Sequence, residues 1–151
     1  MKRLAALFVA LAIPAAALAT DSALTAAERW EADKTTIFEA TEVGIDEFLW
    51  LARPVVVFAE TARNPDFQRQ ITLLQARPEE LAIRDVVIIV DADPEARSEW
   101  RLRLRPRGFM LAVLDKDGRI ELRKPVPWDV REISRSIDSM PLRRREIREG
   151  R

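Results

Sequence analysis

The sequence predicts an α/β domain built on a four-stranded mixed sheet, with the element order β-α-β-α-β-β-α after an extra N-terminal helical segment. Apolar, β-branched runs at residues 54–59, 86–90 and 109–114 have the composition of strands buried on both faces. Helix signals separate these three runs, which favours parallel strands joined by right-handed crossovers. A more alternating run at residues 119–124 adds an antiparallel edge strand.

The helices are predicted from their caps and apolar spacing. Thr25 to Glu28 matches a capping box, with a helix to about residue 35, and residues 45–51 carry apolar side chains at helical spacing. Asn64-Pro65 reads as an N-cap followed by the first helical position. Asp93-Pro94 opens another helix by the same reasoning, and Asp129 caps the last one.

The turn between the last two strands is predicted from Asp115-Lys116-Asp117-Gly118, which has the chemistry of a tight hairpin. The same residues superficially suggest a metal loop, but hairpin geometry accounts for them.

The N-terminus predicts export. Lys2 and Arg3 precede an apolar run, and Ala17-Leu18-Ala19 supplies the small-residue pattern of a cleavage site. We therefore expect a signal peptide at residues 1–19, a helical segment at 20–52, the α/β domain at 53–140 and an arginine-rich tail at 141–151. The product is expected to be periplasmic or secreted.

Charge argues against nucleic acid as a partner. The chain has 25 basic and 25 acidic residues, and cleavage removes Lys2 and Arg3, which leaves a net charge of about −2. No second long apolar run follows, so no stable membrane anchor is expected after cleavage.

The chain contains no cysteine and no histidine. Thiol–disulfide exchange and thiol peroxidase chemistry need a thiolate, so both are excluded. The usual neutral-pH general base is also absent. We expect no catalytic residue and no cofactor, although an enzyme that uses only carboxylates or hydroxyls stays open.

Four segments carry a resemblance, and they are Trp50 to Phe58, Arg107 to Met110, Asp115 to Gly118, and Asp138 to Arg145. They resemble a bacterial domain-of-unknown-function family with a thioredoxin-like fold, whose modules also occur in vertebrate sushi-repeat-containing extracellular proteins. The resemblance implies that fold and export, but no reaction.

The predicted element order is similar to that of thioredoxin, but this chain has other residues at the positions of the thioredoxin redox groups. In an ungapped comparison, Ala62 and Pro65 stand where thioredoxin has its two redox cysteines, and Val56 stands where it has its buried acid. The cis-proline position falls near Gly108 to Met110. The resemblance therefore implies a redox-inactive relative.

A binding surface is expected where the loop after the first strand meets the segment before the third. Free N–H groups at a helix N-terminus and forked guanidinium groups both suit anions. The candidate residues are Thr61, Arg63, Asn64, Arg105, Arg107 and Gly108. The alternative is that Asn64 is only a cap and that the arginines are solvated.

Asp91, Asp93 and Glu95 are candidate ligands for a divalent metal, because three carboxylates follow the second strand at alternate positions. The alternative is that Asp93 is an N-cap and that the acids favour the helix dipole.

The tail is a second candidate contact surface through Arg143, Arg144, Arg145 and Arg148. These arginines equally complement the C-terminal dipole of the preceding helix. The expected function is that of a binding or interaction module with a periplasmic protein partner, in an oligomeric state that the sequence leaves open. The alternative is a small-ligand or divalent-metal-dependent enzyme.

Overall fold

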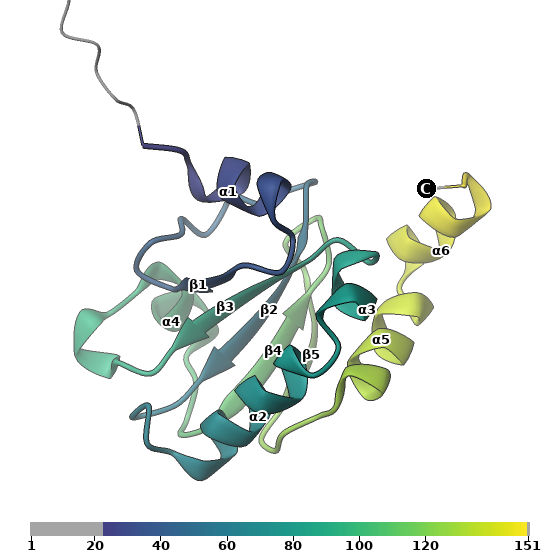
Figure 1. Cartoon of the computed structure of the whole chain (residues 1–151). Coiled ribbons are helices and arrows are strands. Elements are labelled where there is room, and N and C mark those ends of the chain that lie inside the picture. Colours follow the sequence, from purple (N-terminus) through teal and green to yellow (C-terminus); the bar gives the residue numbers. More distant parts are fainter. Residues whose placement is uncertain (1–22, 151) are drawn as a thin grey trace, which may run out of the picture.

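A five-stranded mixed sheet forms the centre of the computed structural model, which describes residues 23–150 (Figure 1). The strands are β1 (Ile37–Glu39), β2 (Arg53–Phe58), β3 (Val86–Asp91), β4 (Met110–Leu114) and β5 (Ile120–Lys124). Their order across the sheet is β1-β3-β2-β4-β5. β1 and β2 run parallel to β3, whereas β4 runs antiparallel to both β2 and β5. The predicted mixed α/β class is confirmed.

The predicted count of four strands is wrong, because β1 adds a fifth within the segment expected to be helical. β1 has three residues, of which Phe38 is buried, and it pairs with β3 through Ile37 opposite Ile88. A strand this short shows no period along the sequence. Its pairing with β3 is what defines it.

β4 also differs from prediction, because it runs antiparallel to β2 rather than parallel. Phe58, the last residue of β2, lies opposite Met110, the first of β4. The helix expected from Asp93 is two short pieces, η1 (Pro94–Ala96) and α4 (Glu99–Leu104), separated by Arg97 at φ 48°. At 1.5 Å per residue α4 spans about 9 Å, while a six-residue strand spans about 20 Å. The connection therefore returns the chain to the end of the sheet from which it left.

Helices cover both faces of the sheet, as Figure 1 shows. On one face α1 (Ala26–Ala32) and α4 contribute Trp30 and Trp100 to the core. The other face carries α2 (Pro65–Gln75), α3 (Pro78–Ala82) and α5 (Val130–Ser139). Along β2, Val56 and Phe58 pack on the first side and Val55 and Val57 on the second. The predicted burial of this strand on both faces is confirmed.

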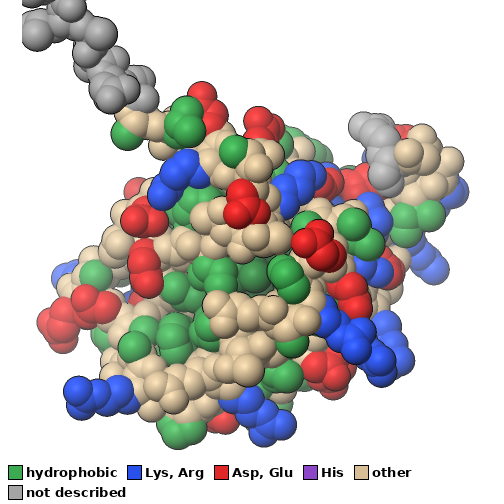
Figure 2. All heavy atoms as spheres, viewed as in Figure 1, with side chains coloured by type: hydrophobic (Ala, Val, Ile, Leu, Met, Phe, Trp, Pro, Cys, Tyr) green, Lys and Arg blue, Asp and Glu red, His purple; other side chains and the backbone are tan. Residues whose placement is uncertain are grey.

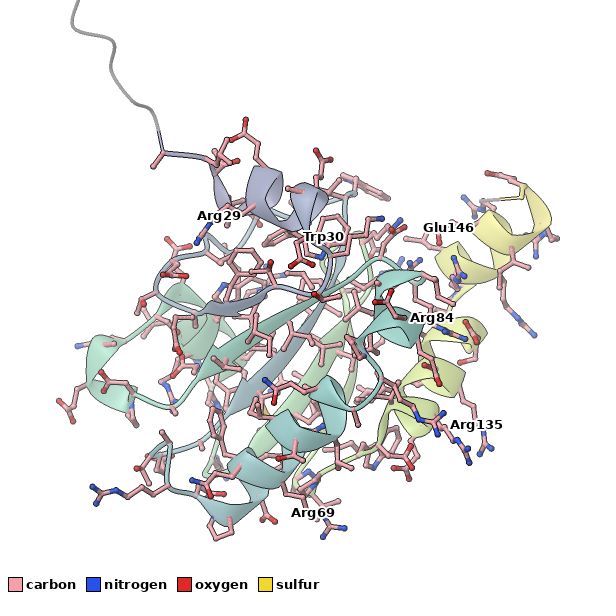
Figure 3. All side chains as sticks on the ribbon, viewed as in Figure 1. Arg29, Trp30, Arg69, Arg84, Arg135 and Glu146 are labelled. Atoms are coloured by element: carbon pink, nitrogen blue, oxygen red, sulfur yellow. The ribbon has the colours of Figure 1, made fainter. Side chains whose placement is uncertain are left out.

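The predicted caps of α1, α2 and α5 are confirmed. Thr25 and Asp129 each accept a hydrogen bond in the side chain from the backbone N–H three residues later. Each also donates its own backbone N–H to the carboxylate of Glu28 or Glu132, so both form capping boxes. The Asn64 Oδ1 accepts from the backbone of the first turn of α2. α1 is firmly attached, because Trp30 is 1% exposed and its Nε1 donates to the Val86 carbonyl at 3.0 Å. Figure 3 shows Trp30 between α1 and the sheet.

The helix predicted at residues 45–51 is instead a series of turns. Trp50 has φ 62°, which no α-helix contains, and its N–H donates to the Lys116 carbonyl at 2.7 Å rather than to the preceding turn. A tertiary hydrogen bond thus replaces the helical one.

The segment predicted as a tail forms the helix α6 (Pro141–Arg148), which lies beside α5 (Figure 1). Over residues 23–150, no helix is long and apolar enough to cross a bilayer. Figure 2 shows acidic and basic side chains interspersed on the face in view. The predicted signal peptide lies outside the described residues.

Candidate functional site

One edge of the sheet gathers most of the predicted site residues, and we call it the loop edge. The parallel strands β2 and β3 end there, β4 begins there, and β5 ends there with Lys124 opposite Leu111. The loops that leave or enter at this edge are residues 59–64, 92–98, 105–109 and 125–129. In open α/β sheets, the carboxyl ends of strands are the usual place for ligands.

A surface pocket of about 400 Å³ opens at the loop edge between the ends of β4 and β5, and we call it the basic pocket. Its lining residues are Arg105, Arg107, Phe109, Met110, Arg123, Lys124 and Pro125. Four of the seven are cationic and none is acidic. The volume lies in the range of small-ligand sites, and a lining of cationic and apolar side chains is chemically suited to an anion with some apolar surface.

Arg105 and Arg107, the two arginines predicted from sequence, are the cations of this pocket whose side chains have no partner among the described residues. Arg105 and Arg107 are exposed, and neither side chain forms a hydrogen bond or ion pair with another described residue. By contrast, Arg123 Nη1 donates to the Leu104 carbonyl at 2.7 Å. Lys124 Nζ lies 4.3 Å from the centroid of the Trp128 ring. Arg105 and Arg107 are therefore free to bind a ligand without losing an internal partner.

Arg105 occupies a backbone position that favours glycine. It ends α4 with φ 49° and ψ 58°, and its N–H donates to the Arg101 carbonyl at 2.9 Å. A left-handed residue usually closes a helix as glycine, because a Cβ at this φ costs about 1–2 kcal/mol. Gly108, with φ 67°, brings the chain back into β4. Strained backbone is a frequent feature of functional sites, and this one lies in the lining of the basic pocket.

Replacing Arg105 with glycine is expected to leave the free energy of unfolding unchanged or raise it by up to about 1 kcal/mol, because relief of backbone strain offsets the entropy of glycine in the unfolded chain. Chemical denaturation measures this. The matched control is Leu102→Gly, an exposed position inside α4, which should lose about 1 kcal/mol. Equal losses at both positions would show that Arg105 carries no backbone strain.

The loop after β2 lies outside the lining of the basic pocket. Asn64 Oδ1 accepts from the N–H groups of Asp66 and Phe67 at 2.9 and 3.1 Å, so its capping role is accounted for. Thr61 Oγ1 accepts from the Arg63 N–H at 3.3 Å. Arg63 is exposed, and its side chain has no hydrogen-bond or ionic partner among residues 23–150. The structure thus brings Arg105 and Arg107 together but not with Thr61, Arg63 or Asn64.

The carboxylate of Asp91 is bound by Arg101, which was not among the predicted site residues. Arg101 reaches Asp91 Oδ1 at 2.7 Å and also donates to the Ala59 carbonyl at 2.8 Å, and the Ser98 hydroxyl donates to Asp91 Oδ2. Asp91 is 4% exposed, so this pair is buried. Arg101 ties the ends of β2 and β3 to α4.

The other two carboxylates of the candidate metal site are spread along the loop. Asp93 Oδ1 accepts a hydrogen bond from the Glu95 N–H at 3.1 Å and so caps η1. This is the N-cap role that was the alternative to metal binding. A pocket of about 130 Å³ brings Asp91 and Asp93 beside Glu39, but Glu95 does not line it. Burial, with the charges of Glu42 and Asp91, raises the pKa of Glu39. Within the described part of the chain, no three acidic, histidine or cysteine residues group to hold a metal ion.

A buried ion network occupies the opposite end of the sheet, and the sequence reading missed it. Arg53 is 0% exposed; its Nε donates to Asp115 at 2.9 Å, its Nη1 to the Arg84 carbonyl at 3.0 Å, and its Nη2 to Glu146 at 3.0 Å. Lys116 also pairs with Glu146, at 3.0 Å. The signal was an arginine at the head of an otherwise apolar strand, since buried charges need partners.

The predicted tail residues divide between this network and solvent. Arg143 lies 3.3 Å from Glu146 and 3.7 Å from Asp138, and it is largely buried. Arg144, Arg145 and Arg148 are exposed, and no side-chain partner for them exists among the described residues. Figure 3 shows Glu146 on α6 and Arg84 between α3 and α5, where Arg84 binds Asp138 at 2.8 Å. Ionic contacts therefore hold α6, none of whose residues is completely buried.

Acid should weaken this attachment. Burial raises the pKa of the Glu146 carboxyl, but hydrogen bonds and charges from Arg53 and Lys116 outweigh it and hold the pKa below its usual range. A carboxyl with a lowered folded pKa stabilises the protein above its unfolded pKa, and that contribution is lost as pH falls.

Glu146→Gln is therefore expected to lower the melting temperature at pH 7, and the difference from wild type should shrink as pH falls from about 5 towards 2. Thermal unfolding followed by circular dichroism measures both. Glu60→Gln, at an exposed position, is the matched control, which should leave the melting temperature at pH 7 close to that of wild type. A difference of constant size across the range would contradict the ionic role of Glu146.

The described chain is thus an α/β domain with a basic pocket at one end of its sheet and a buried ion network at the other. It belongs to the family described as Domain of unknown function (DUF4174), whose model matches residues 44–146. No curated protein and no solved structure matches the chain. The match begins before the predicted domain boundary and ends at Glu146, so the family unit includes most of α6. Arg53, Asp115 and Arg143, from three of the segments that carried the resemblance, all lie in the buried ion network.

Proposed function

We propose that this chain is an exported, redox-inactive binding module of thioredoxin-like architecture, and that its partner carries negative charge into the basic pocket. Three features support the architecture: the strand order β1-β3-β2-β4-β5, the two antiparallel strands β4 and β5 at one side, and helices on both faces. Absence of cysteine rules out thiol redox chemistry for this chain.

One observation carries the binding role: Arg105 and Arg107 line a pocket of about 400 Å³ without any internal ionic partner among the described residues. Arg53, Arg84 and Arg101 each bind carboxylates elsewhere in the fold. The uncommitted guanidinium groups suit carboxylates, to which they donate two parallel hydrogen bonds. An enzyme using Asp91, Asp93 and Glu95 has less support, because Asp91 is bound by Arg101 and Asp93 caps η1.

A crosslinked pull-down from the native periplasm tests the proposal with the tagged protein and the double variant Arg105→Ser/Arg107→Ser. We expect a partner captured by wild type and lost with the variant. The matched control is Arg144→Ser/Arg145→Ser, which removes the same charge from the exposed side of α6. Equal capture by the pocket variant would overturn the proposal, and loss with the control alone would move the site to α6. Purified protein should show no insulin reduction and no peroxide turnover.

A further inference from the structure

The basic pocket continues onto an unpaired strand edge. β5 is the last strand in the sheet order, and within the described chain it pairs only with β4. Its five residues leave a row of main-chain N–H and C=O groups along the outer side. The other outer strand, β1, has three residues and offers a shorter edge. An incoming strand therefore finds its best template at β5.

The edge and the pocket meet at Arg123 and Lys124. These are the last two residues of β5 and part of the lining of the basic pocket, which Pro125 extends beyond the strand. A segment that pairs with the outer side of β5 and extends past Lys124 reaches the end of the sheet at which the pocket opens. We expect its side chains to approach Arg105 and Arg107 there.

We infer that the basic pocket receives an extended acidic segment of a protein partner, which adds to β5 as a sixth strand and places two carboxylates, two residues apart, against the cations of the pocket. This inference rests on the function proposed above and names the class of partner. Residues i and i+2 of a strand point to the same face about 6.6 Å apart, so one face of the segment can present both carboxylates. Phe109 and Met110, each 8% exposed, supply part of the apolar lining of the pocket.

Charge favours such a partner over a second copy of this chain. Antiparallel pairing of two β5 strands about Leu122 would set Glu121 opposite Arg123 of the other copy. The same register would bring Arg119 of the second copy beside Pro125, adding a fifth cation to the four of the pocket. Like charges at close range are unfavourable, and Arg105 and Arg107 would stay unneutralised. An acidic segment removes both problems.

The test is a selection of random eight-residue peptides displayed on phage against the immobilised protein, followed by Kd measurements with the best synthetic peptide. We expect enriched peptides to carry two acidic residues two positions apart. Arg105→Gly/Arg107→Ser should weaken the selected peptide about tenfold or more, because hydrogen bonds to charged groups are lost. Arg144→Ser/Arg145→Ser should leave its Kd unchanged. Every second amide of a paired strand donates to its neighbour, and the amides between them face away. N-methylation of the amides that face β5 should therefore abolish binding of the peptide, whereas N-methylation of the others should not.

The other outcomes separate the inference from the function on which it rests. Peptides without acidic bias, or equal tolerance of N-methylation at both sets of amides, would overturn the inference and leave the pocket as the binding site. Unchanged affinity for the pocket variant would overturn both. A wild-type dimer in sedimentation that Glu121→Lys dissociates would show that a second copy occupies β5, and would also overturn the inference.

Discussion

Replacing Arg53 with alanine is expected to lower the free energy of unfolding by about 3–5 kcal/mol, the cost of removing one member of a buried ion pair. The guanidinium is 0% exposed, and it neutralises Asp115, whose side chain is 3% exposed, and Glu146. Without it, Asp115 is left as a buried charge with no cation, and α6 loses one of its ionic anchors. Denaturation in guanidinium chloride measures the loss.

The matched control is Arg119→Ala. Arg119 forms an arginine–aspartate pair of similar length, 2.8 Å to Asp117 against 2.9 Å for Arg53 and Asp115, but its side chain is 80% exposed. Solvent screens an exposed pair, so its contribution to stability is small and this variant should stay close to wild type. Comparable losses in the two variants would contradict the structural role of Arg53. If Arg53→Ala does not fold, Arg53→Lys, which keeps one charge and loses the fork, should fold with reduced stability.

Trp100→Ala is expected to cost about 3–5 kcal/mol through the cavity that it leaves in the core. Trp100 is 0% exposed, it packs in the cluster that α1 and α4 share with the sheet, and its Nε1 donates to the Val43 carbonyl at 2.9 Å. The substitution therefore removes a large apolar side chain and also leaves a carbonyl without its donor. The midpoint of chemical denaturation should fall accordingly.

Trp50→Ala provides the comparison within the same residue type. Trp50 is 68% exposed, so its removal should change stability by about 0.5 kcal/mol or less. A loss for Trp50→Ala as large as that for Trp100→Ala would mean that the turns at residues 45–51 depend on the exposed indole. That result would contradict the core assignment.

The strands and caps were predictable because their signals are local. The runs at residues 54–59, 86–90 and 109–114 match β2, β3 and β4 within one residue at each end. Thr25, Asn64 and Asp129 cap their helices through hydrogen bonds that span two or three residues. β1 and the turns at residues 45–51 escaped prediction, since each depends on a hydrogen bond or pairing with a distant segment.

Two of the four cations that line the basic pocket were predicted from the sequence. Arg105 and Arg107 were singled out from their place before the third strand, and both line the basic pocket. Arg123 and Lys124 were missed, although the predicted antiparallel hairpin already places the end of β5 beside the start of β4. Arg101 binds a carboxylate at the end of β3, a contact that no local pattern indicated.

By itself the sequence determined the α/β class, the burial of the central strands, the principal caps and the exclusion of thiol chemistry, since periodicity, capping and cysteine content are all read from neighbouring residues or from composition. Tertiary structure decided the direction of β4, the fifth strand, the lining of the basic pocket and the fate of the charged side chains. Arg53 contacts Asp115, which lies 62 residues away in the sequence, and Glu146, which lies 93 residues away. Whether an arginine is exposed or buried depends on which distant carboxylate the fold brings next to it. A local sequence pattern does not predict that contact.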